Sequence, residues 1–201
     1  MSITQKIIKR LFDFSLALLG VVSLWWILCG LVLIATIDTR KFGLFSQSRI
    51  GYLGNEFLIF KIRTMQENST ITTHVTTSED SRITIFGRFL RKYKLDELPQ
   101  LINVLMGNMS FVGPRPDVAG FADKLTGDDR IILSVKPGIT GPASISFRDE
   151  EEILAQQNRP IEYNRLVVWP KKILLNKNYI VNYSFKEDLS ILFKTLFNVK
   201  E

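Results

Sequence analysis

The sequence contains only one cysteine, Cys29, and only one histidine, His74, which excludes an intrachain disulfide and a metal site built from several such residues. A lone cysteine cannot form an intrachain disulfide, and Cys29 lies in an apolar segment where no Cys/His metal site can assemble. His74 lies in the polar stretch 66–81, which predicts a surface loop and a solvated histidine. The sequence also contains no internal repeat and no low-complexity tract. The scarcity of cysteine fits cytoplasmic exposure of the soluble part.

The composition predicts one compact domain with a membrane element. The chain has 201 residues, of which 46% are hydrophobic, and this excludes a disordered tail as its main body. Its net charge of +6 favours anionic partners, which include nucleic acid, phospholipid headgroups and phosphorylated metabolites. The charge alone does not choose among these partners.

A long apolar segment lies near the N-terminus. Residues 14–37 form a run of 24 residues without a charge. As a helix the run would extend about 36 Å, which is enough to cross a hydrocarbon core. No small-residue cleavage pattern accompanies it, so we expect a retained anchor rather than a signal peptide. The positive-inside rule sets no orientation, because basic residues flank both ends, namely Lys6, Lys9 and Arg10 before the run and Arg40, Lys41 and Arg49 after it.

Two arrangements of this anchor remain open. Balanced basic flanks suit a re-entrant helix that enters and leaves on one membrane face, whereas the alternative is a straight transmembrane helix. A re-entrant helix must satisfy the backbone groups opened at its bend, and Gly20, Ser23 and Gly30 are available for this. Trp25-Trp26 at mid-segment would mark the depth of a membrane interface.

The residues after the anchor predict a β-hairpin followed by helices. Glycines punctuate residues 42–65, and residues 56–61 are a strand candidate between them. Apolar residues at helical spacing, with Arg and Lys interleaved, predict a basic amphipathic helix over residues 85–94. A further helix is predicted from Pro99, whose missing N–H costs nothing in a first turn.

Two more helices are predicted towards the C-terminus. The acidic run 149–152 opens the first, and it needs no metal to explain it because acids at a helix start interact favourably with the macrodipole. Ser184 and Glu187 match a capping box, and the apolar residues that follow recur at helical spacing. This last helix either packs on the domain or lies in the membrane interface, and the sequence does not decide between them.

Asp96 and Glu97 are the candidate catalytic pair. Because they precede the helix predicted at Pro99, we expect the helix end to hold Asp96 ionised and available as a nucleophile. Adjacent carboxylates repel each other unless a cation lies beside them, so Glu97 invites a divalent ion with oxygen ligands, most simply Mg²⁺. The alternative is that the pair only caps a helix.

Arginines near this pair are candidates for binding phosphate. A guanidinium group can grip two phosphate oxygens at once, and phosphoryl transfer requires such charge neutralisation. Pro114 and Pro116 fix the backbone on either side of one of these arginines, which gives a rigid turn bearing a cation. The candidates are Arg63, Arg91 and Arg115.

Several motifs in a fixed order give the chain a resemblance to a known family. From about Lys6 to the C-terminus it resembles the bacterial sugar transferase family, the monotopic phosphoglycosyl transferases that start surface glycan assembly on polyprenyl phosphate. The motifs that carry the resemblance are Lys61-Ile62-Arg63-Thr64-Met65, Leu95-Asp96-Glu97-Leu98-Pro99-Gln100, residues 107–116 and Lys136-Pro137-Gly138-Ile139-Thr140-Gly141.

The resemblance implies transfer of a phosphosugar from a UDP-sugar to polyprenyl (undecaprenyl) phosphate, the first membrane step of surface polysaccharide or glycoconjugate synthesis. Asp96 would attack the β-phosphorus and release UMP, and the polyprenyl phosphate would then accept the phosphosugar from the aspartate in a ping-pong cycle. The other site residues that the resemblance implies are Glu97 for Mg²⁺, Arg63, Arg91 and Arg115 for the phosphates, and Arg148 near the nucleotide.

The resemblance also implies a helix-rich α+β fold. It predicts a re-entrant membrane helix in residues 1–40 and a small cytosolic α/β catalytic domain in residues 41–201, with a short β-hairpin and interfacial amphipathic helices. The active site would lie at the cytoplasmic face of the bacterial inner membrane, with membrane lipids as partners, while a homodimer stays an open question. Trp25-Trp26 stands where the family commonly has a Ser-Pro break, so we expect the bend at Ser23 or Gly20.

A non-catalytic protein is the alternative function. It would be a membrane-surface binding protein whose basic amphipathic helices recruit a partner or bind anionic lipid. Such a protein would tolerate Asp96→Asn, whereas an enzyme would lose UMP release. Nucleic acid is not an expected partner, because no recognised nucleic-acid module appears and the long anchor argues against that function.

Overall fold

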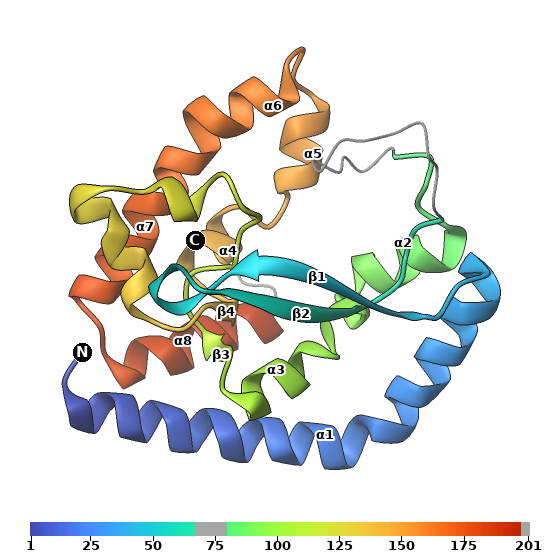
Figure 1. Ribbon diagram of the computed structural model, residues 1–201, viewed down its shortest axis with the longest axis horizontal. Coiled ribbons are helices and arrows are strands. Elements are labelled where there is room, and N and C mark those ends of the chain that lie inside the picture. The colour runs from blue at the N-terminus through green and yellow to red at the C-terminus, as the bar shows by residue number, and fades with distance from the viewer. Residues whose placement is uncertain (67–79, 198–201) are drawn as a thin grey trace.

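The protein is a helix-rich α+β structure in which one long N-terminal helix runs along a small domain (Figure 1). The computed structural model describes residues 1–66 and 80–197. The strands of the described part form two small sheets of two strands each. The predicted α+β class, with a long apolar N-terminal helix, is confirmed.

The helix α1 (Ile3–Thr39) contains the whole predicted apolar segment and extends beyond it at both ends, to a length of 37 residues. Ser2 begins it with a capping box, because its hydroxyl accepts from the backbone N–H of Gln5 and the Gln5 side chain accepts from the backbone N–H of Ser2. The helix is long and apolar enough to cross a membrane. Trp25 and Trp26 are both exposed on it.

The helix α1 bends without breaking. Figure 1 shows it running along the lower edge and then turning upward on the side of α2 (Ile85–Lys92). Near its middle, the Ser23 hydroxyl donates to the carbonyls of Leu19 at 2.7 Å and Gly20 at 3.3 Å. Side-chain bonds of this kind compete with the helix ladder and bend helices. These contacts are of the kind expected at the bend that the sequence analysis predicted at Ser23 or Gly20.

The predicted hairpin is confirmed as β1 (Leu44–Ile50) and β2 (Glu56–Ile62), which pair antiparallel around the short 3₁₀ turn η1 (Tyr52–Gly54). Alternate side chains of a strand point to opposite faces, and directly paired residues share a face. Ile59 is buried, so its face of the hairpin looks into the domain. The pairs on this inner face are Phe45 with Lys61, Gln47 with Ile59 and Arg49 with Phe57.

A second sheet, which the sequence did not predict, is the short parallel pair of β3 (Ser110–Val112) and β4 (Gly138–Thr140). The backbone N–H of Gly113 donates to the Thr140 carbonyl at 2.9 Å. Gly138 is required for this approach, because a Cβ there would lie 2.2 Å from the backbone nitrogen of Gly113. The pair fixes the start of the turn that carries Arg115.

The predicted helices are confirmed over residues 85–94 by α2, after Pro99 by α3 (Gln100–Met106), after the acidic run by α5 (Glu150–Ala155) and at the C-terminal end by α8 (Phe185–Leu196). The predicted loop 66–81 with His74 falls mostly in residues 67–79, outside the described residues. The remaining helical elements are η2 (Leu95–Glu97), η3 (Ala122–Lys124), η4 (Gly127–Ser134), α4 (Pro142–Ser146), α6 (Pro160–Tyr163), the π-helical η5 (Asn164–Val168) and α7 (Trp169–Val181).

The helix α1 packs on the domain at several levels. Ala17 near its middle is buried in a cluster with Ile59 and Val104, which joins α1 to β2 and α3. Ala35 near its C-terminal end is buried in a second cluster with Ile62 and Leu90. The third and largest cluster fills the space between α7, α8 and the strands β1 and β3. Both halves of α1 are thus bound to the same domain.

A buried ion pair joins the N-terminal part of α1 to α8. Lys9 donates to Asp188 at 2.6 Å, and the Tyr183 hydroxyl donates to the same carboxylate at 3.0 Å. Asp188 is 1% exposed. The opposite face of α8 stays exposed, with Phe193 at 57% and Leu196 at 80%. The last helix therefore packs on the domain through one face and presents an apolar face outwards.

Asp188→Asn should lower the free energy of unfolding by about 3–5 kcal/mol, because it leaves the Lys9 ammonium group buried without its partner. Urea unfolding in detergent, followed by circular dichroism, measures this. The matched control is Glu162→Gln, which removes the carboxylate of the exposed Arg159–Glu162 pair and should change the same quantity by less than about 0.5 kcal/mol. Equal effects of the two substitutions would contradict the role assigned to Asp188.

Candidate functional site

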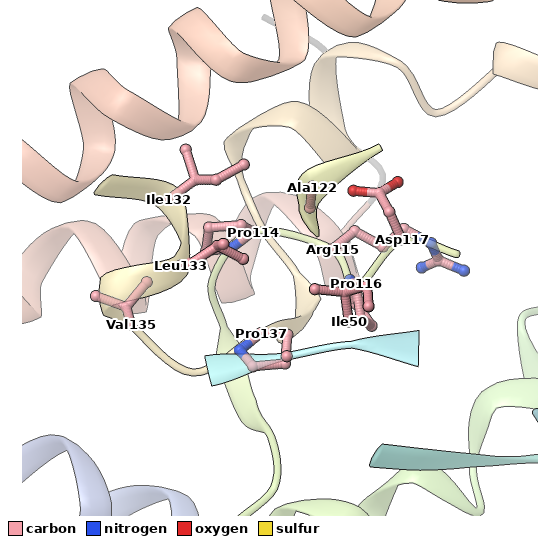
Figure 2. Close-up of a pocket in the computed structure, with 11 residues that line it drawn as sticks. Ile50, Pro114, Arg115, Pro116, Asp117, Ala122, Ile132, Leu133, Val135 and Pro137 are labelled. Atoms are coloured by element: carbon pink, nitrogen blue, oxygen red, sulfur yellow. The ribbon is translucent and has the colours of Figure 1, made fainter. Parts of the chain in front are cut away.

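The turn after β3 carries Arg115 between two prolines, as the sequence predicted. The backbone N–H of Ile50 donates to the Asp117 carbonyl at 2.9 Å, which ties the end of β1 to this turn. A small cavity lies beside the turn, and Figure 2 shows its lining of proline and aliphatic side chains, with Arg115 and Asp117 at its edge. The rigid turn thus projects a cation beside the inner face of the hairpin.

The acid pair lies in η2, a single 3₁₀ turn between α2 and α3. Lys94 enters this turn with a left-handed backbone at φ 56°. The next α-helix begins only at Gln100, so the pair precedes α3 and is not part of its first turn. Asp96 and Glu97 are only 7% and 8% exposed. Two adjacent carboxyl groups are therefore held inside the domain.

Asp96 keeps one carboxyl oxygen free. Its Oδ1 atom is buried and has no hydrogen-bond partner among the residues described. Burial raises the pKa of Asp96 and the Glu97 charge raises it further, while Lys61 and Arg91 lower it. The sequence analysis expected a helix end to favour the ionised form of Asp96, whereas desolvation is the largest influence and shifts the pKa upwards. What the structure offers is a buried oxygen with no competing partner.

Glu97 is held by two cations. Arg115 binds it with both terminal nitrogens, one of them 3.2 Å from Oε2, and Lys61 lies 3.4 Å from Oε1. Burial would raise the pKa of Glu97, but the Arg115 and Lys61 charges outweigh it and hold this pKa well below its usual range. The same contact raises the pKa of Arg115. Glu97 is therefore a fixed anion at the centre of the cluster.

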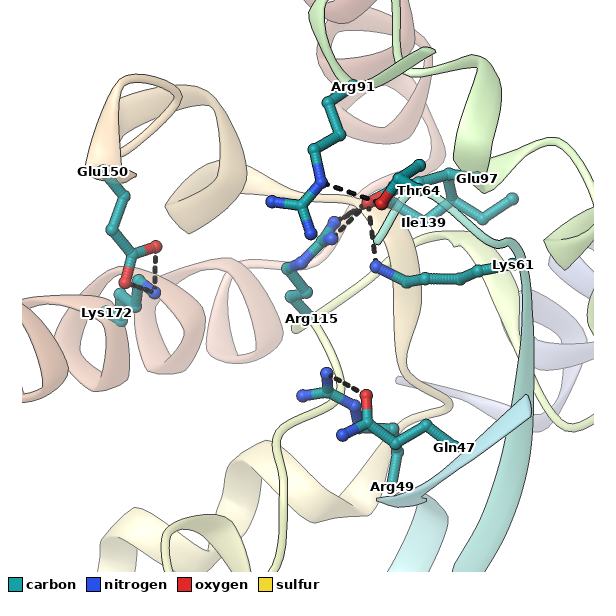
Figure 3. Close-up of polar contacts among 10 residues, drawn as sticks. All are labelled: Gln47, Arg49, Lys61, Thr64, Arg91, Glu97, Arg115, Ile139, Glu150 and Lys172. Carbon is teal, nitrogen blue, oxygen red and sulfur yellow. Dashed lines mark hydrogen bonds and ion pairs between the residues drawn. The ribbon is translucent and has the colours of Figure 1, made fainter. Parts of the chain in front are cut away.

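Arg91 approaches the same cluster from α2. Its Nε donates to the Thr64 hydroxyl at 3.0 Å, and its charge lowers the pKa of Asp96. Figure 3 shows Arg91, Arg115 and Lys61 coming from three different elements towards Glu97. The structure thus brings together four of the predicted site residues, namely Asp96, Glu97, Arg91 and Arg115.

The other two predicted site residues make their described contacts elsewhere. Arg63 donates to the Phe42 carbonyl at 3.0 Å, and its guanidinium group lies 5.1 Å from the centre of the Phe45 ring. Arg148 reaches the carbonyl groups of Lys194 and Thr195, at 3.4 and 3.5 Å, where α8 ends. These contacts do not join Arg63 or Arg148 to the acid pair.

Lys61 is a site residue that the sequence analysis missed as such, although it quoted Lys61 within a motif. The signal was available, because Lys61 lies two residues after Ile59 in an otherwise apolar strand and so points to the same buried face. A lysine at such a position needs an anionic partner. Burial lowers the pKa of Lys61, and the Glu97 charge opposes this shift.

A second group of charges faces the cluster from α5 and α7. Lys172 donates to both oxygens of Glu150, at 2.7 and 2.6 Å. Asp117 lies near this pair, and burial raises the pKa of Asp117 to about 6 against the charges of Lys172 and Arg49. Figure 3 shows the Glu150–Lys172 pair across from Arg115. Charged side chains therefore line two sides of the site.

The acid pair offers the kind of ligands that a magnesium ion shared with a substrate would need. Within residues 1–66 and 80–197, no group of three His, Cys, Asp or Glu side chains is placed to hold a metal ion by itself. Mg²⁺ is commonly bound by one or two carboxylates together with substrate phosphates and water. The unpaired Asp96 oxygen and the ionised Glu97 supply ligands of that kind.

Comparison with known proteins identifies the family to which this chain belongs. The family described as "Bacterial sugar transferase" matches residues 4–201. The chain belongs to the bacterial sugar transferase family. The family resemblance inferred from the motifs of the sequence is thereby confirmed.

Relatives of this sugar transferase carry names that specify a reaction. It is 34% identical over 199 residues to the "UDP-glucose:undecaprenyl-phosphate glucose-1-phosphate transferase" of Escherichia coli (strain K12), covering 96% of this chain and 40% of that protein. A protein with the same name from Xanthomonas campestris pv. campestris is 39% identical, over 78% of this chain and 34% of that protein. The "Uncharacterized sugar transferase EpsL" of Bacillus subtilis (strain 168) is 34% identical, over 94% and 86%. The chain thus spans less than half of the first two relatives.

Proposed function

We propose that this sugar transferase moves a phosphosugar from a UDP-sugar to polyprenyl phosphate, giving polyprenyl-diphosphate-sugar and UMP. The observation that carries the proposal is the buried Asp96 oxygen without a partner, next to Glu97 fixed by Arg115 and Lys61. The names of the relatives specify the same donor and acceptor classes. They give no support to the alternative of a non-catalytic membrane-surface protein.

The reaction proceeds through two displacements at one phosphorus atom. An Asp96 carboxylate oxygen forms a bond to the β-phosphorus of the UDP-sugar, and the bond from that phosphorus to the UMP oxygen breaks. UMP leaves with the electron pair of that bond. A phosphate oxygen of the polyprenyl phosphate then attacks the same phosphorus and breaks its bond to Asp96. The carboxylate is regenerated, and no proton has to be transferred in either step.

The charges of the site stabilise both displacements. Negative charge accumulates on the non-bridging oxygens of the phosphorus and on the leaving oxygen, and preorganised cations lower this cost. Arg115, Lys61 and Arg91 supply such cations next to Asp96. Glu97 would hold Mg²⁺, which when bound supplies further positive charge to the diphosphate oxygens.

The function test is a panel of UDP-sugars incubated with the full-length protein, Mg²⁺ and undecaprenyl phosphate in detergent. At least one UDP-sugar should release UMP in an acceptor-dependent reaction, and the same panel identifies the sugar. No UMP release with any donor, from protein that unfolds cooperatively, would overturn the proposal.

The anchor is proposed to be re-entrant, with the catalytic domain on the cytoplasmic face of the inner membrane. Support comes from the contacts of both ends of α1 with one domain. Arg10 donates to the Val104 carbonyl at 2.6 Å, while Thr36 accepts from the backbone N–H of Gly43 at 2.8 Å. A straight helix across a hydrocarbon core of about 30 Å would put its two ends on opposite sides.

Cysteine labelling in sealed, inside-out vesicles tests this topology. In a Cys29→Ala background, Thr4→Cys and Ser46→Cys place one exposed thiol in the first turn of α1 and one after the helix. A membrane-impermeant maleimide should label both positions from the cytoplasmic side. Labelling of the two positions from opposite sides would rule out the re-entrant arrangement.

A further inference from the structure

Arg49 is a cation without an anion in the part of the chain that the structure describes. One terminal nitrogen donates to the Gln47 side chain at 2.8 Å. Its Nε atom is buried and has no hydrogen-bond partner among the described residues. A partly buried guanidinium group with only a neutral hydrogen-bond partner is unfavourable, because its desolvation is not compensated by an opposite charge at hydrogen-bond distance.

Arg49 lies on the same face of the hairpin as Lys61. Its strand neighbour Ile50 is bonded to Asp117, which brings Arg49 next to the turn that carries Arg115. Figure 3 shows the Arg49 guanidinium group below the Glu97, Arg115 and Lys61 cluster. The cluster and Arg49 thus line one continuous inner surface.

Arg49 has one cationic and two anionic electrostatic neighbours. Burial lowers the pKa of Arg49 and the Arg115 charge lowers it further, while Asp117 and Glu97 act in the opposite direction. Glu97 is already bound to Arg115 and Lys61. An anion bound between Arg49 and Arg115 would relieve this repulsion and supply the missing hydrogen-bond acceptor.

The order of the charged side chains along the hairpin indicates which anion fits. Lys61 pairs across the hairpin with Phe45, and Arg49 lies four residues further along β1, which corresponds to about 13 Å of strand. Asp96, Glu97 and Lys61 mark the end where the attacked phosphorus belongs. Arg115 spans the interval, because its backbone lies near Arg49 and its guanidinium group reaches Glu97. The second phosphate of a nucleoside diphosphate sugar lies next in this order.

We propose that Arg49, together with Arg115, binds the phosphate group that leaves with the nucleoside. This inference rests on the proposed function and adds a nucleotide-binding residue from β1. Arg49 provides a forked donor for two phosphate oxygens, with the unpaired Nε as one of its donors. Arg49 would bind the nucleotide, while Asp96 remains the group that attacks the phosphorus atom.

Arg49→Gln in the full-length protein tests the inference. Isothermal titration calorimetry with UMP, which involves no turnover, should show about tenfold weaker binding, the loss expected for one charge-assisted contact. The kcat/KM for the UDP-sugar should fall by at least a similar factor. The KM for undecaprenyl phosphate should not change. Arg49→Lys keeps the charge without the fork and should lie between wild type and Arg49→Gln.

Arg130→Gln is the matched control, because Arg130 is an exposed arginine on η4 and its loss changes the net charge equally. Its affinity for UMP should equal that of wild type. If Arg49→Gln binds UMP as tightly as wild type does, the inference is overturned. A rise in the KM for undecaprenyl phosphate alone also overturns it, because Arg49 would then bind the phosphate of the lipid carrier. Failure of the proposed function would appear differently, as no UMP release by the wild-type protein.

Discussion

Asp96→Asn should abolish UMP release while leaving the fold intact. We expect the rate to fall by at least about 10³-fold, because an amide oxygen is a poor nucleophile and no other described carboxylate with a free oxygen lies beside Asp96. UMP release is measured with the best donor from the UDP-sugar panel. Asp128→Asn, which removes an exposed carboxylate, is the matched control and should keep full activity.

Thermal stability and UMP release measured together on Asp96→Asn separate catalysis from helix capping. The folded-state pKa of Asp96 is raised, so its ionised form is less favourable in the folded protein than in the unfolded chain at pH 7. Replacing it with a neutral amide should therefore leave the Tm unchanged or raise it. If the pair only capped a helix, the substitution would leave UMP release unaffected. Retained activity would contradict the role of Asp96.

Arg115→Gln should reduce both activity and stability. Loss of a preorganised cation at a transferring phosphoryl group typically costs about 10²–10³-fold in rate. Glu97 would keep only Lys61 as a partner, so we also expect about 1–3 kcal/mol of destabilisation, less than for a fully buried pair because the Arg115 side chain is 40% exposed. Single-turnover UMP release and urea unfolding measure the two effects.

The double variant Arg115→Gln with Glu97→Gln separates these two effects. Removing both charges leaves no unpaired carboxylate, so stability should recover towards wild type. Activity should stay as low as in Arg115→Gln, because the phosphate-binding cation is still missing. Recovery of activity in the double variant would contradict a direct role of Arg115 in the reaction.

Elements with a strong local pattern could be predicted from the sequence. The glycine turns that bound the strand candidate 56–61 predicted the hairpin, and the Ser184–Glu187 cap with its apolar spacing predicted α8. The β3–β4 pair could not be predicted, because each strand has three residues and the pairing depends on contact between Gly113 and Gly138. The local sequence pattern is sufficient to predict a helix or a hairpin, but it does not specify which distant segments come into contact.

The same distinction explains the candidate site. Asp96, Glu97, Arg91 and Arg115 were found because their motifs are contiguous or close in sequence. The upward shift of the Asp96 pKa was not foreseen, because it depends on burial, which the local sequence does not show. The contact of Arg148 with the end of α8 depends on folding of the whole domain. Lys61 could have been predicted as a site residue, because it lies two residues after Ile59 in β2 and therefore points to the same buried face.

Intact-mass spectrometry of the protein with a UDP-sugar and Mg²⁺, but without polyprenyl phosphate, tests the central claim most directly. The account predicts a mass increase of one phosphosugar, which peptide mapping assigns to Asp96 and which disappears when undecaprenyl phosphate is added. Rapid turnover with both substrates, and no adduct in samples quenched within the first turnover, would contradict an aspartyl intermediate.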